Sequence, residues 1–296
     1  MGKPPWLRIR HIENAGSAEV AGLMKGLSLH SVCQSAHCPN RSECWANKTA
    51  SFMVMGEFCT RACRFCAVKT MGKPPSLDPN EPKNLAEAVA SLGLRYVVVT
   101  CVTRDDLPDG GAEHLARCVR ELKAKMPELI VETLVPDFFA RGEAIRVVAG
   151  SGVDVVSHNI ETIERLSSRV RDRRANYRQS LETLRLFREL SGGKIITKSG
   201  IMAGLGERGD EVEMAMKDLL AVGVEILTVG QYLSPGKAPR HLPVEEYVAP
   251  DRFAGYEKMA YSLGFAYVAS GPFVRSSYRA AEPFINGSLR SRAGSP

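Results

Sequence analysis

Short β-rich runs alternate with helical stretches along most of this 296-residue chain, and this alternation constrains the fold more than any other feature. Runs rich in Val, Ile and Thr favour strands, here at residues 52–56, 96–100, 130–134, 153–157, 195–197, 226–229 and 266–269. Helical stretches fall at 84–92, 112–125, 142–149, 177–190, 210–221 and 252–263. Strands that alternate with helices of this length imply parallel βα units. The pattern predicts an α/β fold built as a full or partial (β/α) barrel.

A doubly wound open sheet is the alternative architecture. It is weakened because no Gly-x-Gly-x-x-Gly opens a helix near the start of the chain. Polar or reactive residues follow the predicted strands in groups at 59–66, 104–106, 158–161, 198–200, 231–232 and 275–278. The carboxyl ends of the strands form the active face of a βα barrel. We therefore expect one site that is gathered from across the chain.

Six of the eight cysteines form two triplets. The first triplet, with the spacing C-x4-C-x5-C, consists of Cys33, Cys38 and Cys44. The second, with the spacing C-x3-C-x2-C, consists of Cys59, Cys63 and Cys66. Structural zinc takes four protein ligands, and ordinary iron–sulfur clusters take four cysteines. Three cysteines on a [4Fe–4S] cluster leave one iron open, which favours chemistry at that iron. The two remaining cysteines, Cys101 and Cys118, are expected to be small buried hydrophobic residues.

The redox state of the cysteines depends on the compartment. No stretch reaches about 18 apolar residues, the length that spans a membrane, and residues 1–6 resemble neither a secretory signal nor a transit peptide. We therefore expect a cytoplasmic protein with no membrane partner. Cysteines stay reduced there, so metal ligands are favoured over the alternative of a disulfide framework.

The net charge of +6 includes an arginine-rich stretch at 165–178. This stretch is either a solvated helix edge or loop, or a binding patch for an acidic protein or for nucleic acid. No aromatic-rich nucleic-acid motif accompanies it, so a protein partner is favoured and no nucleic-acid partner is expected. The predicted organisation is an N-terminal extension at 1–50 with irregular structure that carries the first triplet, a barrel at 51–270, and a C-terminal extension at 271–296. Its last part, 281–296, is expected to be mobile.

The second triplet, Cys59-Thr-Arg-Ala-Cys63-Arg-Phe-Cys66, resembles the signature of radical S-adenosylmethionine (SAM) enzymes, including the aromatic Phe65 before the last cysteine. The resemblance implies a partial (β/α)6-type TIM barrel of the radical SAM kind. It also implies that Cys59, Cys63 and Cys66 are catalytic, because they hold the cluster whose open iron binds SAM. Reductive cleavage of SAM then supplies radical chemistry that belongs to the cofactor.

Together with the first triplet and a late Arg275-Ser-Ser-Tyr278, the chain resembles the lipoyl synthase family over roughly residues 3–280. Further matching motifs lie at 3–7, 104–111, 158–162, 197–202, 204–207, 230–233, 241–243 and 271–278. The resemblance implies insertion of two sulfurs at C6 and C8 of an octanoyl chain carried on a lysine. An auxiliary [4Fe–4S] cluster on the first triplet would donate the sulfur, with Ser277 as its fourth ligand. Ser276 remains an alternative ligand, and a simple turn-capping role for both serines stays open.

The same resemblance implies where SAM binds. Contacts are expected from Thr100, Asn159, Glu161, Lys198, Gly200, Met202 and Gln231. The alternatives are an ordinary strand-to-helix turn at 200–207 and a helix-capping role for Glu161 or Thr162. His158 is expected to be a hydrogen-bonded structural residue. The chain departs from many relatives at Cys101 and Thr103 and lacks a usual proline at 170–175, which leaves the shape of that loop open.

The implied partners are octanoylated lipoyl-carrier domains, either acyltransferase subunits of 2-oxoacid dehydrogenases or the glycine cleavage H protein. A ferredoxin or flavodoxin would donate electrons, and an iron–sulfur carrier would rebuild the consumed cluster. Three other functions are weighed against this one: a radical SAM sulfur inserter acting on a biotin precursor or tRNA, a two-cluster electron carrier, and a zinc-stabilised RNA-binding module.

Overall fold

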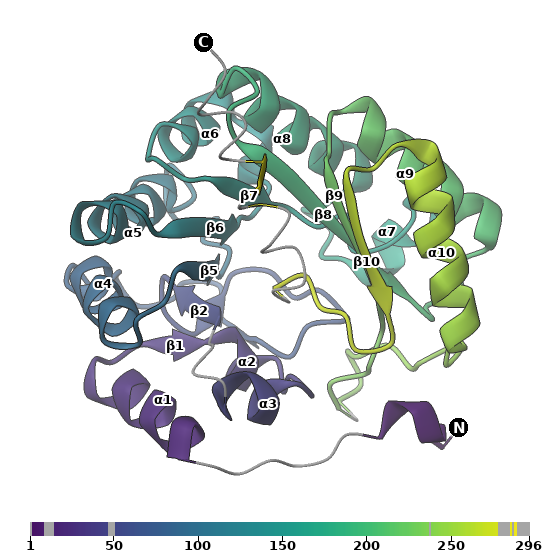
Figure 1. Ribbon diagram of the computed structural model, residues 1–296, viewed down its shortest axis with the longest axis horizontal. Coiled ribbons are helices and arrows are strands. Elements are labelled where there is room, and N and C mark those ends of the chain that lie inside the picture. The colour runs from purple at the N-terminus through teal and green to yellow at the C-terminus, as the bar shows by residue number, and fades with distance from the viewer. Residues whose placement is uncertain are drawn as a thin grey trace. The chain divides into compact units, whose positions relative to one another are not determined.

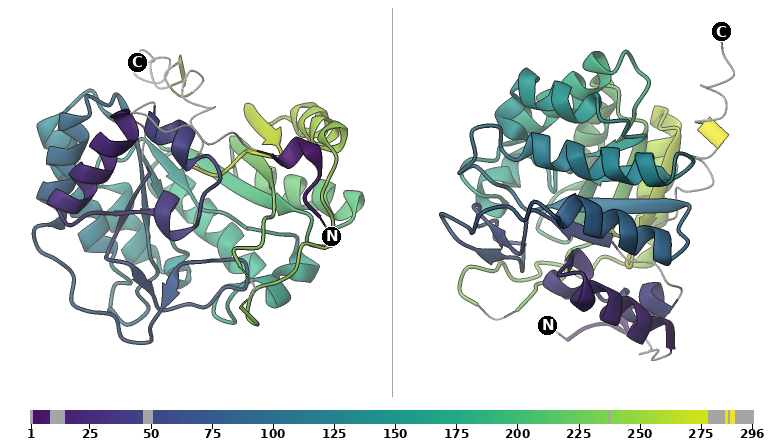
Figure 2. Two further views of the ribbon diagram at one scale, coloured as in Figure 1. Left: turned by 90° about the horizontal axis from the view of Figure 1, so that it is seen from below. Right: turned by 90° about the vertical axis from the view of Figure 1, so that its left-hand side faces the viewer.

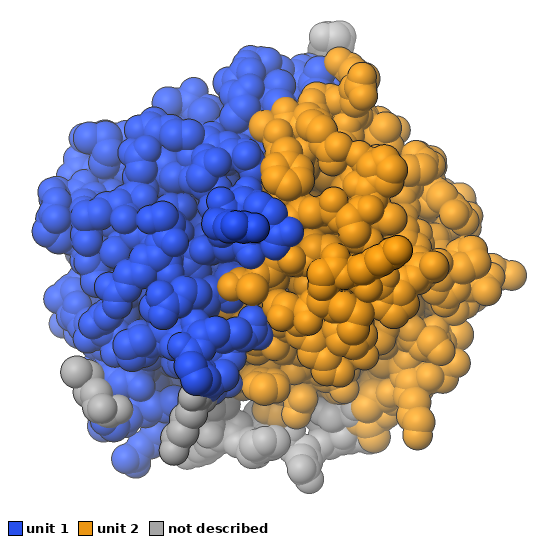
Figure 3. All heavy atoms as spheres, turned by 180° about the vertical axis from the view of Figure 1, so that it is seen from behind, with its two compact units in different colours: residues 1–8, 63–65, 154–296 blue, residues 9–62, 66–153 orange. Residues whose placement is uncertain are grey.

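The computed structural model describes residues 2–8, 15–46, 51–236, 238–277, 285 and 287–288. The chain divides into two compact units, which Figure 3 distinguishes by colour. Unit 1 contains residues 1–8, 63–65 and 154–296, and unit 2 contains residues 9–62 and 66–153. Tyr278 of the late motif lies outside the described residues, as does the predicted mobile tail apart from 285, 287 and 288.

Unit 2 contains a sheet in the order β1-β2-β5-β6, in which β1 is antiparallel and the other strands are parallel. Its strands are β1 (His30–Ser31), β2 (Ser51–Val54), β5 (Tyr96–Cys101) and β6 (Ile130–Leu134), and a separate short parallel pair is formed by β3 (Phe58–Cys59) and β4 (Lys69–Thr70). Its helices are α1 (Ala15–Gly26), α2 (Val32–Ser35), α3 (Arg41–Ala46), α4 (Glu81–Ser91), α5 (Ala112–Lys125) and α6 (Gly142–Ala149), with the short turn η2 (Phe138–Ala140) after β6.

The helices α4, α5 and α6 cover the outer side of β2, β5 and β6 (Figure 1). They pack side by side, as the right-hand view of Figure 2 shows. The strand β5 is covered on both faces, so five of its six residues are buried, as in parallel sheets generally. The helix α5 buries Leu115, Cys118, Val119 and Leu122, which share one face at helical spacing.

Unit 1 contains four parallel strands in the order β7-β8-β9-β10. Its elements are η1 (Pro5–Leu7), β7 (Val155–Ser157), α7 (Glu164–Val170), α8 (Tyr177–Leu190), β8 (Ile196–Ala203), α9 (Gly209–Ala221), β9 (Ile226–Gln231), α10 (Pro250–Leu263) and β10 (Tyr267–Gly271). The side chain of Asn176 caps α8 by accepting a hydrogen bond from the Gln179 amide. Gly264 ends α10 with φ +113, a conformation that glycine adopts without strain.

The predicted strand and helix segments are present, but two details were wrong and one short helix was not predicted. The described part of the N-terminal extension is not irregular throughout, since it contains α1 and α3. The strand predicted at 195–197 continues to Ala203 because Lys198–Ala203 pairs in register with Ile226–Gln231. Lys198, Gly200 and Met202 therefore lie within a strand and not after it. The arginine-rich stretch contains the short helix α7, which was not predicted.

Among the described residues, no helix is both long enough and apolar enough to cross a membrane.

Candidate active site

The first half of the C-x3-C-x2-C motif is anchored in unit 2. Cys59 ends β3, and its carbonyl accepts a hydrogen bond from the Met71 amide at 3.0 Å. The buried hydroxyl of Thr60 donates to the Thr103 carbonyl and accepts from the Asp105 amide, each at 3.0 Å. The amide of Arg61 donates to the Cys59 Sγ at 3.4 Å. The spacer residues of the motif thus fix Cys59 to the loop that follows β5.

The middle of the motif, residues 63–65, is anchored in unit 1. The Asp172 amide donates to the Cys63 Sγ at 3.2 Å, and the Arg64 amide donates to the carbonyl of Val170 at the end of α7 at 2.9 Å. Phe65 packs against the hydrophobic core of this unit. Sequence reasoning missed the role of Asp172, because its amide is 109 positions from Cys63 and carries no motif. Backbone amides that donate hydrogen bonds to cysteine sulfurs are typical of iron–sulfur sites, where they help to set the reduction potential of the cluster.

The backbone amides of the first triplet make short-range hydrogen bonds within unit 2. The Ser31 side chain caps α2 by accepting a hydrogen bond from the Cys33 amide at 3.1 Å. The Cys38 amide donates to the Cys33 carbonyl at 3.0 Å, and the Cys44 amide donates to the Asn40 carbonyl at 2.9 Å. No disulfide bond joins the six described cysteines of the two triplets.

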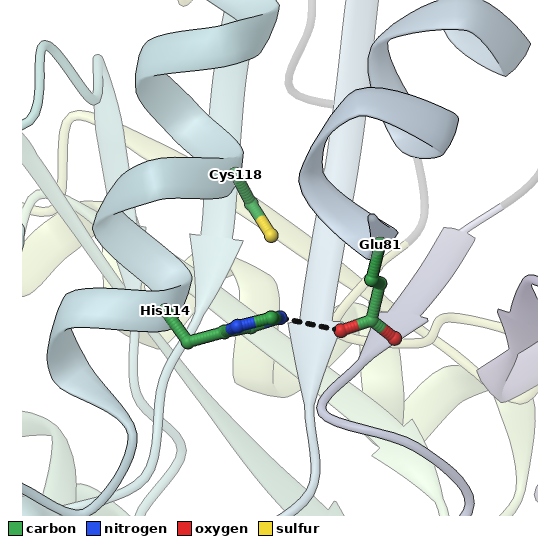
Figure 4. Close-up of side chains that lie close together, drawn as sticks. All are labelled: Glu81, His114 and Cys118. Carbon is green, nitrogen blue, oxygen red and sulfur yellow. Dashed lines mark hydrogen bonds and ion pairs between the residues drawn. The ribbon is translucent and has the colours of Figure 1, made fainter. Parts of the chain in front are cut away.

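Among the described residues, Glu81, His114 and Cys118 form a group that could ligate a metal (Figure 4). The possible ligand atoms of these three side chains all lie within 4.8 Å of one another. The His114 Nε2 hydrogen-bonds the Glu81 Oε2 at 2.7 Å, and the same oxygen accepts the Met55 amide at 2.8 Å. Burial and the Glu81 charge raise the pKa of the Cys118 thiol well above its usual value, so it stays protonated. Cys118 is a core residue as predicted, and Glu81 holds the chain just before the second triplet.

Cys101 also behaves as a small apolar residue. Burial, and then the neighbouring Cys59 and Glu81, raise the pKa of its thiol above the usual value. The Cys101 Sγ donates to the Leu134 carbonyl at 3.5 Å. A protonated thiol is a poor metal ligand, so these contacts favour the packing role over the ligand role.

In unit 1, the polar side chains of Asn159 and Glu161 lie next to each other and next to Gly200. The Asn159 Nδ2 donates to the Glu161 Oε1 at 3.2 Å, whereas the buried Asn159 Oδ1 has no hydrogen-bond partner in the described structure. A Cβ on Gly200 would lie 2.9 Å from that oxygen and 2.8 Å from the Thr228 Oγ1. A buried acceptor without a partner costs free energy unless a ligand or water satisfies it. The Asn159 Oδ1 can therefore accept a hydrogen bond from a ligand that carries a hydroxyl or ammonium group.

Glu161 is held in an unusual backbone conformation. Its φ is +67, which is rare outside glycine and is found at functional sites. Its amide donates to the Gly200 carbonyl at 3.1 Å and its carbonyl accepts the Met202 amide at 2.9 Å. Burial raises the pKa of its carboxyl, and the charge of Arg171 opposes this effect. The capping alternative is not supported, because α7 begins after Ile163 with no side-chain cap.

The other residues that were predicted to contact SAM differ in their burial and in their hydrogen-bond partners. The Thr100 hydroxyl donates to the Phe52 carbonyl at 2.9 Å in unit 2. The buried Gln231 uses its Nε2 on three backbone carbonyls and its Oε1 on the Val248 amide, so its side chain supports the surrounding loops. Lys198 is buried and Met202 is half-buried in β8. His158 hydrogen-bonds the Ser180 Oγ at 2.8 Å, as expected for a structural histidine.

The segment that carries Ser277 folds back over β9. A Cβ on Gly230 would overlap the carbonyl oxygen of Val274 and would lie 3.4 Å from the Arg275 guanidinium. The Val274 amide donates to the Gly271 carbonyl at 3.1 Å, which turns the chain directly after β10. Only glycine at position 230 permits this approach. Ser276 and Ser277 are half-buried in this turn.

The arginine-rich stretch is largely used in ion pairs within unit 1. The pairs are Arg165–Glu211, Arg169–Glu245, Arg174–Asp172 and Arg178–Glu164 at 2.6 to 2.9 Å. The buried Arg171 donates to the Ser180 Oγ at 2.8 Å. Much of the positive charge is therefore balanced locally, which weakens the predicted docking patch.

The sequence model of the Radical SAM superfamily matches residues 53–219. Methylornithine synthase aligns with a TM-score of 0.53 over 95% of this chain and 93% of its own, at 12% identity. The maturase HydG from Carboxydothermus hydrogenoformans aligns with a TM-score of 0.54 over 81% and 65%, at 11% identity. At such identities the two structures are similar in fold alone. The parallel βα units, the partial-barrel fold and the cysteine motif thus define a radical SAM protein.

Curated relatives narrow the family. A lipoyl synthase of Anaeromyxobacter sp. (strain Fw109-5) is 55% identical over 99% of both chains. A mitochondrial lipoyl synthase of Aedes aegypti is 51% identical over 98% of this chain and 74% of its own. The chain belongs to the lipoyl synthase family of the radical SAM superfamily. It is a sulfur-inserting enzyme, and its cofactors are SAM and [4Fe–4S] clusters, as predicted.

Proposed function

We propose that this chain inserts two sulfur atoms at C6 and C8 of an octanoyl chain carried on a lysine. In this proposal Cys59, Cys63 and Cys66 hold the [4Fe–4S] cluster that binds SAM, and Cys33, Cys38 and Cys44 hold the auxiliary cluster. The observation that carries the first assignment is the pair of amide donors aimed at sulfur, from Arg61 to Cys59 and from Asp172 to Cys63.

The cluster and SAM together supply one-electron chemistry that can break unactivated C–H bonds. The protein positions SAM and excludes competing reactions. Asn159 offers a buried acceptor without a partner, and Glu161 offers a carboxylate next to it. Gly200 lets the Asn159 side chain pack directly against the backbone of β8, because a Cβ at this position would overlap the Asn159 Oδ1. Lys198 and Met202 are proposed as further contacts from the same strand, whereas Thr100 and Gln231 are proposed to support the site through their backbone hydrogen bonds.

Ser277 is proposed as the fourth ligand of the auxiliary cluster. A hydroxyl is a hard donor, and iron in a sulfide cluster is better matched by thiolate. The iron bound by serine should therefore be the first to leave when sulfur is transferred. The close approach of Val274 to Gly230 fixes where this segment packs against β9. Ser276 in the same turn is the alternative ligand.

The proposed substrate is an octanoylated lipoyl-carrier domain, either an acyltransferase subunit of a 2-oxoacid dehydrogenase or the glycine cleavage H protein. A ferredoxin or flavodoxin is the proposed electron donor, and an iron–sulfur carrier is proposed to rebuild the consumed cluster. The proposed location is the cytoplasm. Of the arginines in the stretch 165–178, the exposed Arg173 is the proposed contact for an acidic carrier.

The proposal is tested by anaerobic turnover of an octanoyl-lysine peptide with SAM and a reductant, read by mass spectrometry. We expect a product that carries two sulfur atoms, and two cleaved SAM molecules for each product. Stoichiometric zinc without iron–sulfur absorption would contradict the cluster assignment. SAM cleavage without sulfur transfer to this peptide would instead leave the cofactors in place and reject the substrate.

A further inference from the structure

The spacer of the second triplet contains a buried cation with two buried acidic partners. The Arg61 guanidinium, 5% exposed, donates from Nε and Nη2 to the two oxygens of Asp105 at 2.9 and 3.0 Å. It donates from Nη1 and Nη2 to the two oxygens of Asp137 at 2.6 and 2.8 Å. Asp137 is fully buried, and Asp105 is 11% exposed. Both contacts are bidentate, which only the planar fork of an arginine can provide.

The three charged residues come from three separate segments of unit 2. Arg61 lies two positions after Cys59, Asp105 follows β5, and Asp137 follows β6. An arginine guanidinium stays protonated in proteins, so the pairing of Arg61 with two carboxylates keeps a positive charge in the network. Together the three side chains carry one net negative charge.

A strained turn supports Asp137. Phe138, Phe139 and Ala140 follow it with φ of +46, +53 and +53, a left-handed conformation that is unfavourable for residues with a Cβ. The Asp137 carboxylate accepts the Phe139 amide at 3.0 Å, and the Phe139 ring lies 4.9 Å from the Arg61 guanidinium. Strain of this kind persists only where surrounding contacts over-determine it, and it concentrates at functional sites.

Stability alone does not account for this arrangement. A buried ion pair often contributes little net stability, because the desolvation of the charges offsets their attraction. Its better-attested role is to specify one conformation. Arg61 is also too deeply buried to reach a substrate. The residue that these contacts fix is Cys59, whose sulfur accepts the Arg61 amide.

We propose that Arg61 is a positioning residue, and that the Arg61–Asp105–Asp137 network holds Cys59 in its cluster-binding conformation and lowers the reduction potential of that cluster. The inference rests on the proposed assignment of Cys59, Cys63 and Cys66 to a [4Fe–4S] cluster. The network makes the spacer of the motif part of the site. Its net negative charge disfavours the extra electron of the reduced cluster, so the network also acts electrostatically.

The test compares Arg61→Lys and Asp137→Asn in the anaerobically loaded enzyme. Both should lose iron to a chelator about 10- to 100-fold faster than the wild type, the usual cost of losing a residue that orients a metal ligand. Asp137→Asn should raise the reduction potential, because it removes a negative charge while its shape stays similar. Arg61→Gln, where it folds, should lower the potential. If the network were purely structural, these two substitutions would not shift the reduction potential in opposite directions.

Arg64→Gln is the matched control, since Arg64 lies in the same motif but its side chain is exposed. It should lose iron at the wild-type rate. In the iron-free full-length chain, hydrogen exchange at the Thr60 and Arg61 amides should be slow for wild type and at least about tenfold faster for Asp137→Asn, as local opening becomes easier.

Wild-type iron retention in both Arg61→Lys and Asp137→Asn, or an unshifted reduction potential in Asp137→Asn, would overturn the inference. Equal losses in Arg64→Gln would overturn it as well, because the effect would then not be specific to the network. A wild-type chain that binds no cluster would instead reject the proposed function, while the exchange measurement would still report on the network.

Discussion

The two cysteine triplets are held by contacts of different range. Cys59 and Cys63 are fixed by partners far along the chain: Thr60 bonds to Thr103 across 43 positions, and Cys63 bonds to Asp172 across 109. The hydrogen bonds donated by the backbone amides of Cys33, Cys38 and Cys44 instead span two to five positions, and Ser31, which receives the Cys33 amide, donates in turn to the Ser51 carbonyl across 20 positions. One triplet is thus tied through its spacer residues to distant parts of the chain, whereas the amides of the other are bonded within local turns and short helices.

This difference suits the roles that we propose. A site fixed by long-range contacts keeps its shape through many reaction cycles, as a cluster that repeatedly cleaves SAM requires. A site held by local contacts can open and be rebuilt without disturbing the rest of the fold, since local openings cost less than global unfolding. Substitutions in the two triplets and around them should therefore have different effects on iron content, SAM cleavage and sulfur insertion.

Alanine substitutions separate the triplets most strongly. Replacing Cys59, Cys63 and Cys66 should abolish SAM cleavage, because SAM loses its iron. Replacing Cys33, Cys38 and Cys44 should leave about four irons, those of one [4Fe–4S] cluster, and should retain SAM cleavage without any sulfur in the product. The measurements are iron content and 5′-deoxyadenosine formation. Lipoyl product from the second variant would show that the sulfur has another source.

Gly230→Ala should displace the segment that carries Ser277, because the added Cβ would overlap the Val274 carbonyl. Overpacking of this kind costs about 1–3 kcal/mol, so we expect sulfur insertion to fall by about tenfold or more, while SAM cleavage stays near the wild-type rate. Gly271→Ala is the control, since its Cβ would meet only the Val274 Cγ2 at an ordinary 3.5 Å. If both variants lose sulfur insertion equally, the packing of this segment against Gly230 is not specifically required.

The ion pair of Glu211 with Arg165 links α9 to α7, whose end holds Arg64. The hydrogen bond from Arg165 and the Arg208 amide lower the pKa of Glu211 to about 2. Because this pKa is below the unfolded value, the stabilisation is complete above about pH 4.5 and disappears as pH falls through about 2. Glu211→Gln should therefore lower the Tm at neutral pH, and this difference should shrink toward pH 2.

Glu213→Gln is the comparison for this pH series, since Glu213 pairs with Lys217 within the same exposed helix face. It should change the Tm little, as exposed ion pairs contribute roughly 0–1 kcal/mol. A Glu211→Gln difference that stays constant from pH 7 to 2 would show that the lost contact is not ionic.

The smallest expected effect is a gain in stability. Ala140 has φ +53, and the left-handed conformation costs a residue with a Cβ about 1–2 kcal/mol. Ala140→Gly should relieve this strain. Glycine is more flexible than alanine in the unfolded chain, and this flexibility lowers the gain in folding stability by about 0.4–1 kcal/mol. We expect a net gain of about 0.5–1 kcal/mol in denaturant unfolding. Ala144→Gly, inside α6, should instead destabilise the protein by about 1 kcal/mol. A loss of stability in both variants would show that Ala140 is not strained.

Much of the fold was predictable because its signals are local. The helices at 112–125, 142–149 and 177–190 were predicted with the bounds that the structure shows, since their apolar residues follow helical spacing. The length of β8 was not predictable, because Lys198 and Ser199 are polar and enter the strand only by pairing with β9. The short α7 was also hidden, since its arginines were interpreted as a surface feature.

The candidate site shows the same limit. The cysteines were found from their spacing, but their anchors depend on contacts between distant residues. Asp137 was not singled out, although it follows a predicted strand, because nothing local indicates that its carboxylate meets Arg61. Gln231 was predicted to contact SAM, and the structure shows that backbone groups use its whole side chain. A motif therefore identified important residues without separating ligand contacts from structural support.

The central claim is that one cluster persists and the other is consumed. The direct measurement is a single anaerobic turnover of the fully loaded enzyme, followed by iron analysis and a second assay of SAM cleavage. The account predicts that about four irons become available to a chelator, those of one [4Fe–4S] cluster, while SAM cleavage continues at its initial rate. Loss of SAM cleavage together with the iron, or retention of all the iron after sulfur has been transferred, would contradict it.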